Sequence, residues 1–77
     1  MPKILQAQNI ASVGSIQFVI DKTGAITAIN VTCEVNYGEL GMAETVDILP
    51  NLNVAQKMAA KTFYDRLKQI LTEILIA

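Results

Sequence analysis

The sequence contains no histidine, no tryptophan and a single cysteine, Cys33. Structural zinc sites need four Cys or His ligands, and catalytic zinc sites usually have three protein ligands rich in His, so neither is expected here. One thiol cannot form an intrachain disulfide, which excludes the disulfide framework of small secreted proteins. The absence of histidine also removes the commonest general base and proton shuttle.

Charged residues are scarce, at 17% of the chain against a usual figure of about 25%. Six Lys and Arg against seven Asp and Glu give a net charge of −1, whereas nucleic-acid binding normally begins with a basic face. Four of the cations lie in the last third, beside Asp65 and Glu73. A weakly basic helical face is one interpretation of this stretch, but a solvated face is the more common one. We expect no nucleic-acid partner.

Long hydrophobic runs are also missing. Lys68 and Glu73 interrupt the most apolar stretch, so no window of eighteen apolar residues exists. The first nine residues contain Lys3 but no apolar core of a signal peptide. The sequence therefore predicts neither a membrane partner nor export by a signal peptide.

Apolar residues, by contrast, make up 52% of the 77-residue chain. The length allows a single domain, 1–77, and a domain of this size buries only about 60% of the surface that its unfolded chain exposes. Many apolar groups would stay exposed in a monomer. Self-association is the simplest way to cover them.

Alternating apolar residues over 15–21 predict a first strand, followed by a hairpin turn. The turn is marked by Asp21, whose carboxylate can accept from the backbone two residues on, and by Gly24, which supplies a positive φ. Residues 1–14 mix apolar and polar positions without a clear period. They fit an arm, a frayed terminus or an edge strand.

A second strand is predicted over about 25–37, where odd positions are apolar and even positions polar. Ile26 breaks this alternation, which suggests a bulge near Thr27 and Ala28. Cys33 lies on the apolar side. We interpret it as a small core residue and not as a reactive thiol, because no Lys or Arg is within nine residues of it in sequence.

Gly38 and Gly41 bracket a predicted second turn, and a third strand follows over 42–49. Glu44 falls on the apolar side of that strand. Either it protects a sheet edge, where an inward charge blocks unwanted pairing, or the assigned register is wrong. Pro50 should end the strand because it has no amide hydrogen.

The last third predicts one long helix over 54–76, with Asn53 as N-cap and Gln56 completing a capping box. An apolar stripe recurs at helical spacing along it. A helix of this length spans about 34 Å, whereas a seven-residue strand spans about 23 Å. The end of the helix should therefore overhang its own sheet.

We infer that this overhanging end is buried against other copies of the chain. The alternative is that it folds over the N-terminal arm. The candidate interface residues are Leu67, Ile70, Leu71, Ile74, Leu75 and Ile76.

Catalytic motifs are not found: the sequence has no phosphate-binding loop and no nucleophile paired with a base. Glu34 and Glu44 are the best candidate for a paired carboxylate, and Glu39, Glu44 and Asp47 for a cation site, but both patterns are common on polar sheet faces. We expect no enzyme, no metal and no cofactor. The candidate contact residues for a partner or ligand are Tyr37, Gly38, Glu39, Leu40, Arg66 and Lys68.

The run of segments 20–27, 29–37, 47–50 and 64–67 resembles small phage-encoded proteins that have a β-meander followed by one helix and come from tail and structural gene regions. The resemblance implies a virion or assembly component, or an accessory factor made in the cytoplasm of an infected bacterium. It transfers no functional residue to this chain.

The sequence thus predicts an α+β domain: an antiparallel meander of three strands, or four if residues 1–14 add one, packed by one long C-terminal helix. We expect a dimer or trimer that also binds another protein and acts as a non-enzymatic structural or interaction module. The alternative function is an inhibitor that binds a host defence protein or sequesters a signalling nucleotide, with Arg66 or Lys68 on its phosphates.

Overall fold

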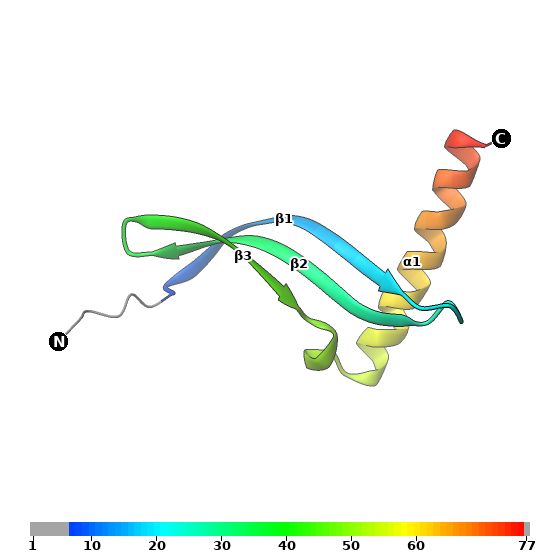
Figure 1. The fold of residues 1–77 in the computed structure, drawn as a ribbon, viewed down its shortest axis with the longest axis horizontal. Helices are drawn as coiled ribbons and strands as arrows, with labels where there is room; N and C mark the ends of the chain where they lie inside the picture. The colour runs from blue at the N-terminus through cyan, green and yellow to red at the C-terminus, as the bar shows by residue number, and fades with distance from the viewer. Residues whose placement is uncertain (1–6, 77) are drawn as a thin grey trace.

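The computed structural model describes residues 7–76 and confirms the predicted α+β architecture (Figure 1). The elements follow one another as β1 (Asn9–Ile20), β2 (Ile26–Tyr37), β3 (Leu40–Asp47), a 3-10 turn η1 (Leu49–Asn51) and α1 (Val54–Leu75). The three strands form one antiparallel sheet in the order β1-β2-β3. The sheet is therefore a meander, and the long helix follows it in the chain.

Among residues 7–76 the sheet has three strands, and no separate fourth strand precedes β1. Residues 9–14 instead form the first half of β1, which makes the edge-strand interpretation correct for them. Of the rest of the predicted segment, residues 7 and 8 precede β1, with the amide of Gln8 donating to the carbonyl of Asn36 at 2.8 Å, and residues 1–6 lie outside the described residues.

The turn between β1 and β2 is built as the sequence predicts. Oδ1 of Asp21 accepts hydrogen bonds from the amide of Thr23 at 2.9 Å, the hydroxyl of Thr23 at 2.6 Å and the amide of Ala25 at 3.0 Å. Gly24 has a φ of 85°, a conformation that costs a residue with a Cβ about 1–2 kcal/mol. Because these hydrogen bonds stabilise the charged carboxylate, the pKa of Asp21 is lowered, and the bond from the Thr23 hydroxyl makes the largest contribution.

The turn between β2 and β3 has only two residues, Gly38 and Glu39, so it is tighter than the four-residue loop that the glycines suggested. Gly38 has a φ of 67°, and no other described residue of this turn has a positive φ. A positive φ at the first of two turn residues is the pattern of a type II′ hairpin. Such a turn continues the right-handed twist of the two strands it joins.

Bulges bring the apolar residues of β1 onto one face of the sheet. The pairing with β2 skips Ala11 and Gly14, so that Ile10 lies opposite Val35 and Val13 opposite Cys33. Each skipped residue adds one to the normal spacing of two. The predicted bulge in β2 is also present, because Thr27 has no partner and Ile20 lies opposite Ile26.

The same face continues across β3. Val46 lies opposite Val31, Met42 opposite Val35, and Glu44 opposite Cys33. The register predicted for Glu44 is therefore correct, and its carboxylate is on the apolar face of an edge strand. The strand ends at Asp47, before Pro50, which lies in η1.

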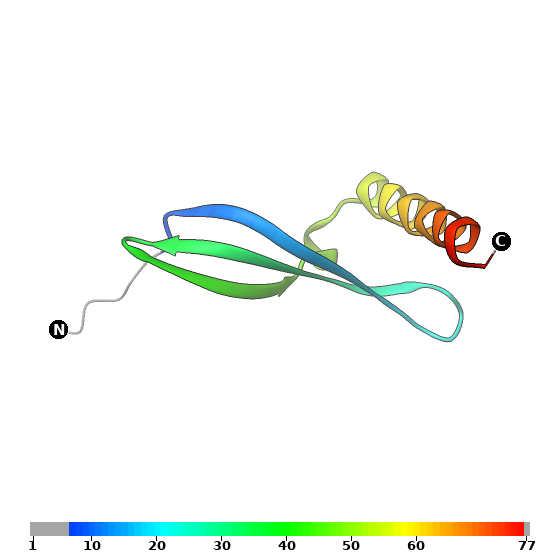
Figure 2. The ribbon, with the colours of Figure 1, turned by 90° about the horizontal axis from the view of Figure 1, so that it is seen from above.

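The helix begins with the predicted capping box. The side chain of Asn53 accepts from the amide of Gln56 at 2.8 Å, and the side chain of Gln56 accepts from the amide of Asn53 at 3.0 Å. The aromatic ring of Phe18 on β1 contacts that of Tyr64, with 5.4 Å between the ring centroids. This contact places the helix over the end of the sheet nearest the β1–β2 turn (Figures 1 and 2).

The reasoning from length alone is wrong, because β1 and β2 each have 12 residues and extend about 40 Å, more than the helix. The helix overhangs the sheet for another reason. It crosses the long ribbon of β1 and β2 steeply, near their turn, and its last turns project past the sheet (Figure 1). Crossing direction, not length, leaves the end of the helix without a sheet beneath it.

The core of the described chain is very small. Ile29 is 3% exposed and Val35 is 5% exposed, and these are the buried apolar residues among those described. The radius of gyration is 16.4 Å, whereas a compact chain of this length would have about 11.5 Å. The molecule is elongated, with principal extents of 57 × 27 × 21 Å.

Candidate functional site

The end of the helix presents an uncovered apolar surface, which we call the helix tip and define as Leu71, Ile74, Leu75 and Ile76. Their exposed fractions lie between 52 and 77%. Two further residues of the predicted interface, Leu67 and Ile70, are half-buried on the helix before the tip. Residues 7–14 do not cover the tip, because they lie at the other end of the sheet (Figure 1).

A second uncovered apolar surface lies on the sheet, and the sequence reasoning missed it. We call it the open sheet face. Its exposed fractions lie between 49 and 60%, and it consists of Ile10, Val13 and Ile16 on β1 and Leu40, Met42 and Val46 on β3. The sequence feature that marks this face on β1 is the spacing of three between Ile10, Val13 and Ile16. Because one bulged residue lies in each interval, the three side chains point to the same face of the sheet.

One polar contact lies on this face. The hydroxyl of Tyr37 donates to Oε1 of Glu44 across 3.3 Å. Burial raises the pKa of Tyr37, and the nearby Glu44 carboxylate raises it further because it opposes a second negative charge. Tyr37 thus supplies a hydrogen-bond donor to the Glu44 carboxylate, which would otherwise face apolar side chains.

The candidate contact residues do not form one site. Tyr37, Gly38, Glu39 and Leu40 lie at the β2–β3 turn, and Arg66 and Lys68 lie on the helix at the opposite end of the long axis (Figure 1). Of the first group, Tyr37 is half-buried and the other three are exposed.

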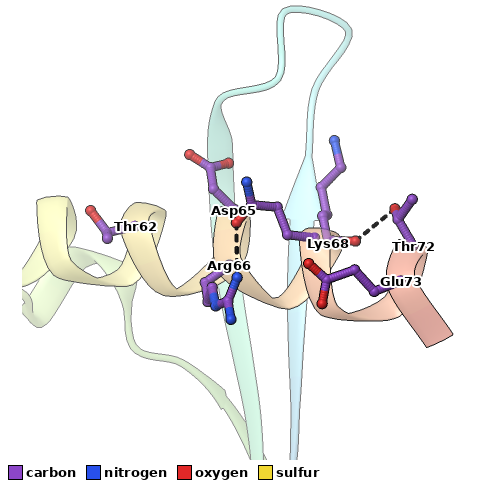
Figure 3. A pocket seen from close by; sticks show the side chains of 7 residues that line it. Thr62, Asp65, Arg66, Lys68, Thr72 and Glu73 are labelled. Carbon is purple, nitrogen blue, oxygen red and sulfur yellow. Dashed lines mark hydrogen bonds between the residues drawn. The ribbon is translucent and has the colours of Figure 1, made fainter. Parts of the chain in front are cut away.

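A shallow hollow on the helix is lined by Arg66 and Lys68 among other polar residues. Arg66 donates to Oε1 of Gln69 at 3.2 Å, and Nζ of Lys68 lies 5.8 Å from the centre of the Tyr64 ring. The two cationic side chains point to different sides of the helix (Figure 3). Within one chain they do not converge on a phosphate-sized ligand.

The carboxylates do not converge either. Glu34 lies opposite Ala43 and Glu44 opposite Cys33, so the two glutamates point to opposite faces of the sheet. Asp47 uses Oδ1 to accept from the amides of Ile29 and Leu49, both at 3.0 Å, which gives it a structural role. Within residues 7–76 no group of three Cys, Asp or Glu side chains could hold a metal ion.

Cys33 lies on the apolar face, as predicted, and is half-buried there between Val13 and Glu44. In the described part of the chain, no helix has the length and apolar character needed to cross a membrane.

Residues 7–76 thus present two uncovered apolar surfaces, the helix tip and the open sheet face, and no metal-binding cluster among them. Comparison of this chain with protein-family models, with curated proteins and with solved structures finds no match.

Proposed function

We propose that this protein is a non-enzymatic interaction module that works as a homo-oligomer. The observation that carries the proposal is the near absence of a core, with only Ile29 and Val35 buried among the described apolar residues. Burial of apolar surface is the dominant favourable contribution to folding. A single copy with this arrangement would leave the helix tip and the open sheet face in water, and an exposed patch of this kind marks an interaction surface.

The accessible area supports the same proposal. The chain exposes 6247 Å², whereas a compact monomer of 8.4 kDa exposes about 4600 Å². The excess, about 1600 Å², is in the range that one subunit of an obligate homodimer buries, roughly 1000–2500 Å². Association with identical copies would bring the exposed area back to that of an ordinary small protein.

The resemblance to phage-encoded β-meander-plus-helix proteins supports a second part of the proposal, that the protein acts in a virion or in virion assembly. Quantitative mass spectrometry of purified particles would test this extension. A fixed number of copies per particle supports it, and absence from particles assigns the protein to a non-virion role.

The oligomer itself is tested by sedimentation velocity and native mass spectrometry of the purified protein. We expect a discrete assembly of two or three chains at micromolar concentration. A folded species of 8.4 kDa that persists at all concentrations contradicts the proposal. Small molecules released by heating the assembly would instead favour the nucleotide-binding alternative.

A further inference from the structure

We propose that two copies of the chain pair through their β1 strands, antiparallel and about a twofold axis, so that each helix tip covers the β1 part of the partner's open sheet face. This inference rests on the proposed homo-oligomer and specifies its interface. It assigns a second copy of the same chain as the occupant of the helix tip and of the β1 part of the open sheet face.

The two edges of the sheet differ in their protection against pairing. β1 has 12 residues with no charged residue and no proline. β3 has eight residues, among them Glu44, whose carboxylate is on the apolar face, and Asp47. Proteins commonly protect free edges with short strands and inward charges. β3 carries this protection and β1 does not, which identifies β1 as the edge that pairs.

The regular part of β1 is long enough to support such pairing. Residues 15–19 pair with β2 one for one, without a bulge. The bulges at Ala11 and Gly14 interrupt the other half of β1, so we place the twofold axis at Gly14 or on its helix side.

The direction of the helix fits this pairing. The helix crosses the sheet close to Phe18 and continues past the β1 side, so its tip projects where a sheet extended beyond β1 would continue (Figures 1 and 2). Leu71 and Ile74 follow Leu67 at spacings of four and three, so the stripe that faces the chain's own sheet runs into the tip. A twofold axis perpendicular to the sheet places the apolar faces of both copies on the same side.

The numbering of an antiparallel pair then determines what lies beneath the tip. In such a pair, residues equally distant from the axis along the two β1 strands lie opposite each other. If the axis passes through Gly14, Phe18 of one copy lies opposite Ile10 of the other. If the axis passes Gln17, Phe18 is level with Ile16. Every axis position between these limits places the tip over the β1 part of the partner's open sheet face. Both helix tips and the β1 part of both open sheet faces are thus covered at once, and the two contacts are identical by symmetry.

Ser15 and Thr45 provide a matched pair of test positions. Both lie opposite Thr32, Ser15 on the β1 edge and Thr45 on the β3 edge, and both are exposed. Near the axis, Ser15→Lys would place two lysines side by side, whereas Thr45→Lys would lie far from it. We expect Ser15→Lys to weaken self-association at least tenfold in sedimentation equilibrium, and Thr45→Lys to leave it within twofold of the unmodified protein.

Cysteine cross-linking gives a second measurement that does not depend on a lysine being tolerated. In a Cys33→Ser background, single cysteines replace Ser12, Ser15, Gln17 or Thr45. Opposed residues at the axis of an antiparallel pair have Cα atoms about 4.5–5.5 Å apart, which suits a disulfide. We expect oxidised dimer to peak at one of the β1 positions and to be absent at Thr45.

The outcomes separate this inference from the proposed function. An oligomer that cross-links at Thr45, or at none of the β1 positions, overturns the β1 pairing and leaves the homo-oligomer standing. A monomer overturns both. An oligomer that cross-links through β1 but keeps its affinity after Ser15→Lys overturns the placement of the axis between Gly14 and Gln17.

Discussion

The rings of Phe18 on β1 and Tyr64 on α1 lie 5.4 Å apart, with their planes inclined at 56°. This tilted geometry is one that aromatic pairs favour. The half-buried apolar residues of α1 are Ala60, Tyr64, Leu67 and Ile70, and none of its described residues is fully buried, so the ring contact is one of few that join helix and sheet. It sets where the helix crosses the ribbon and hence where the tip projects.

Replacing Tyr64 tests this anchor. We expect Tyr64→Ala to lower the free energy of unfolding by about 2 kcal/mol, since it removes both the aromatic contact and part of the apolar burial. Tyr64→Phe should cost less than about 0.5 kcal/mol, because the ring remains. Urea unfolding at one fixed protein concentration measures both. Equal stability of the two variants would show that the ring contact does not hold the helix.

The turn at Gly24 can be tested with a second glycine as control. Gly24→Ala should destabilise by about 1–2 kcal/mol because its φ of 85° is unfavourable for any residue with a Cβ, and Gly24→Val should cost more than about 1 kcal/mol for the same reason. Gly14→Ala should be close to neutral, since a Cβ there would lie 3.5 Å from the carbonyl oxygen of Thr32, an ordinary contact. Thermal unfolding followed by circular dichroism gives the values for all three variants. A neutral Gly24→Ala would be inconsistent with the turn described.

Charges on the helix tip should prevent association. Leu71→Asp combined with Ile74→Asp is expected to give a soluble monomer or an unfolded chain, because both side chains would carry charge into the apolar contact. The control, Gln69→Asp with Thr72→Asp, adds the same charge at the same spacing on the polar side of the helix. It should keep the parent mass in sedimentation velocity. If the tip variant also keeps the parent mass and melting temperature, the tip is not an interface.

The pair of Tyr37 and Glu44 predicts a loss of stability at alkaline pH. The folded pKa of Tyr37 is raised above its ordinary value of 10.0, by burial first and by Glu44 second. The protonated tyrosine is therefore favoured in the folded state, so this contribution is fully present below pH 10 and is lost as the pH rises through the folded pKa. Unfolding measured from pH 9 upwards should show the decline.

Tyr37→Phe should flatten this alkaline decline, because phenylalanine has no proton to lose. Glu44→Gln should reduce it but not remove it, since the burial of Tyr37 remains. A decline that is unchanged in Tyr37→Phe must come from another group.

Acid should destabilise the β1–β2 turn. The hydrogen bonds from Thr23 and Ala25 lower the folded pKa of Asp21 below its ordinary value of 3.8. Its contribution is present above pH 3.8 and is lost as the pH falls through the folded pKa. Asp21→Asn should therefore be less stable than the unmodified protein at neutral pH and converge with it in acid. Parallel curves across this range would contradict the assignment.

Sequence reasoning predicted the parts of the fold that local contacts determine. The turn at Asp21 and Gly24 forms from bonds within five residues, and the capping box of Asn53 and Gln56 forms within four. The bulge near Thr27 was also predicted, because Ile26 broke an otherwise regular alternation. In each case the interacting groups are close in the chain, so the side-chain types alone specify the geometry.

Sequence reasoning did not predict the face formed by Ile10, Val13 and Ile16. Their spacing of three fits neither a regular strand nor a helix, and only pairing with β2 shows that Ala11 and Gly14 are bulged. It also underestimated β1, because residues 9–14 of this 12-residue strand lie in the segment for which an arm, a frayed terminus and an edge strand all stay open from the sequence. Strand pairing is non-local, so its register and extent depend on a partner distant in the chain.

The amino-acid sequence alone determines the order of the elements, the position of the two turns and the apolar stripe of the helix. Each of these follows from the period of the side chains and from local hydrogen bonding. The tertiary structure decided the bulged register of β1 and the steep crossing of the helix at Phe18 and Tyr64. Those two features determine which apolar surfaces stay uncovered, since coverage depends on how packed elements are oriented and not on how apolar each one is.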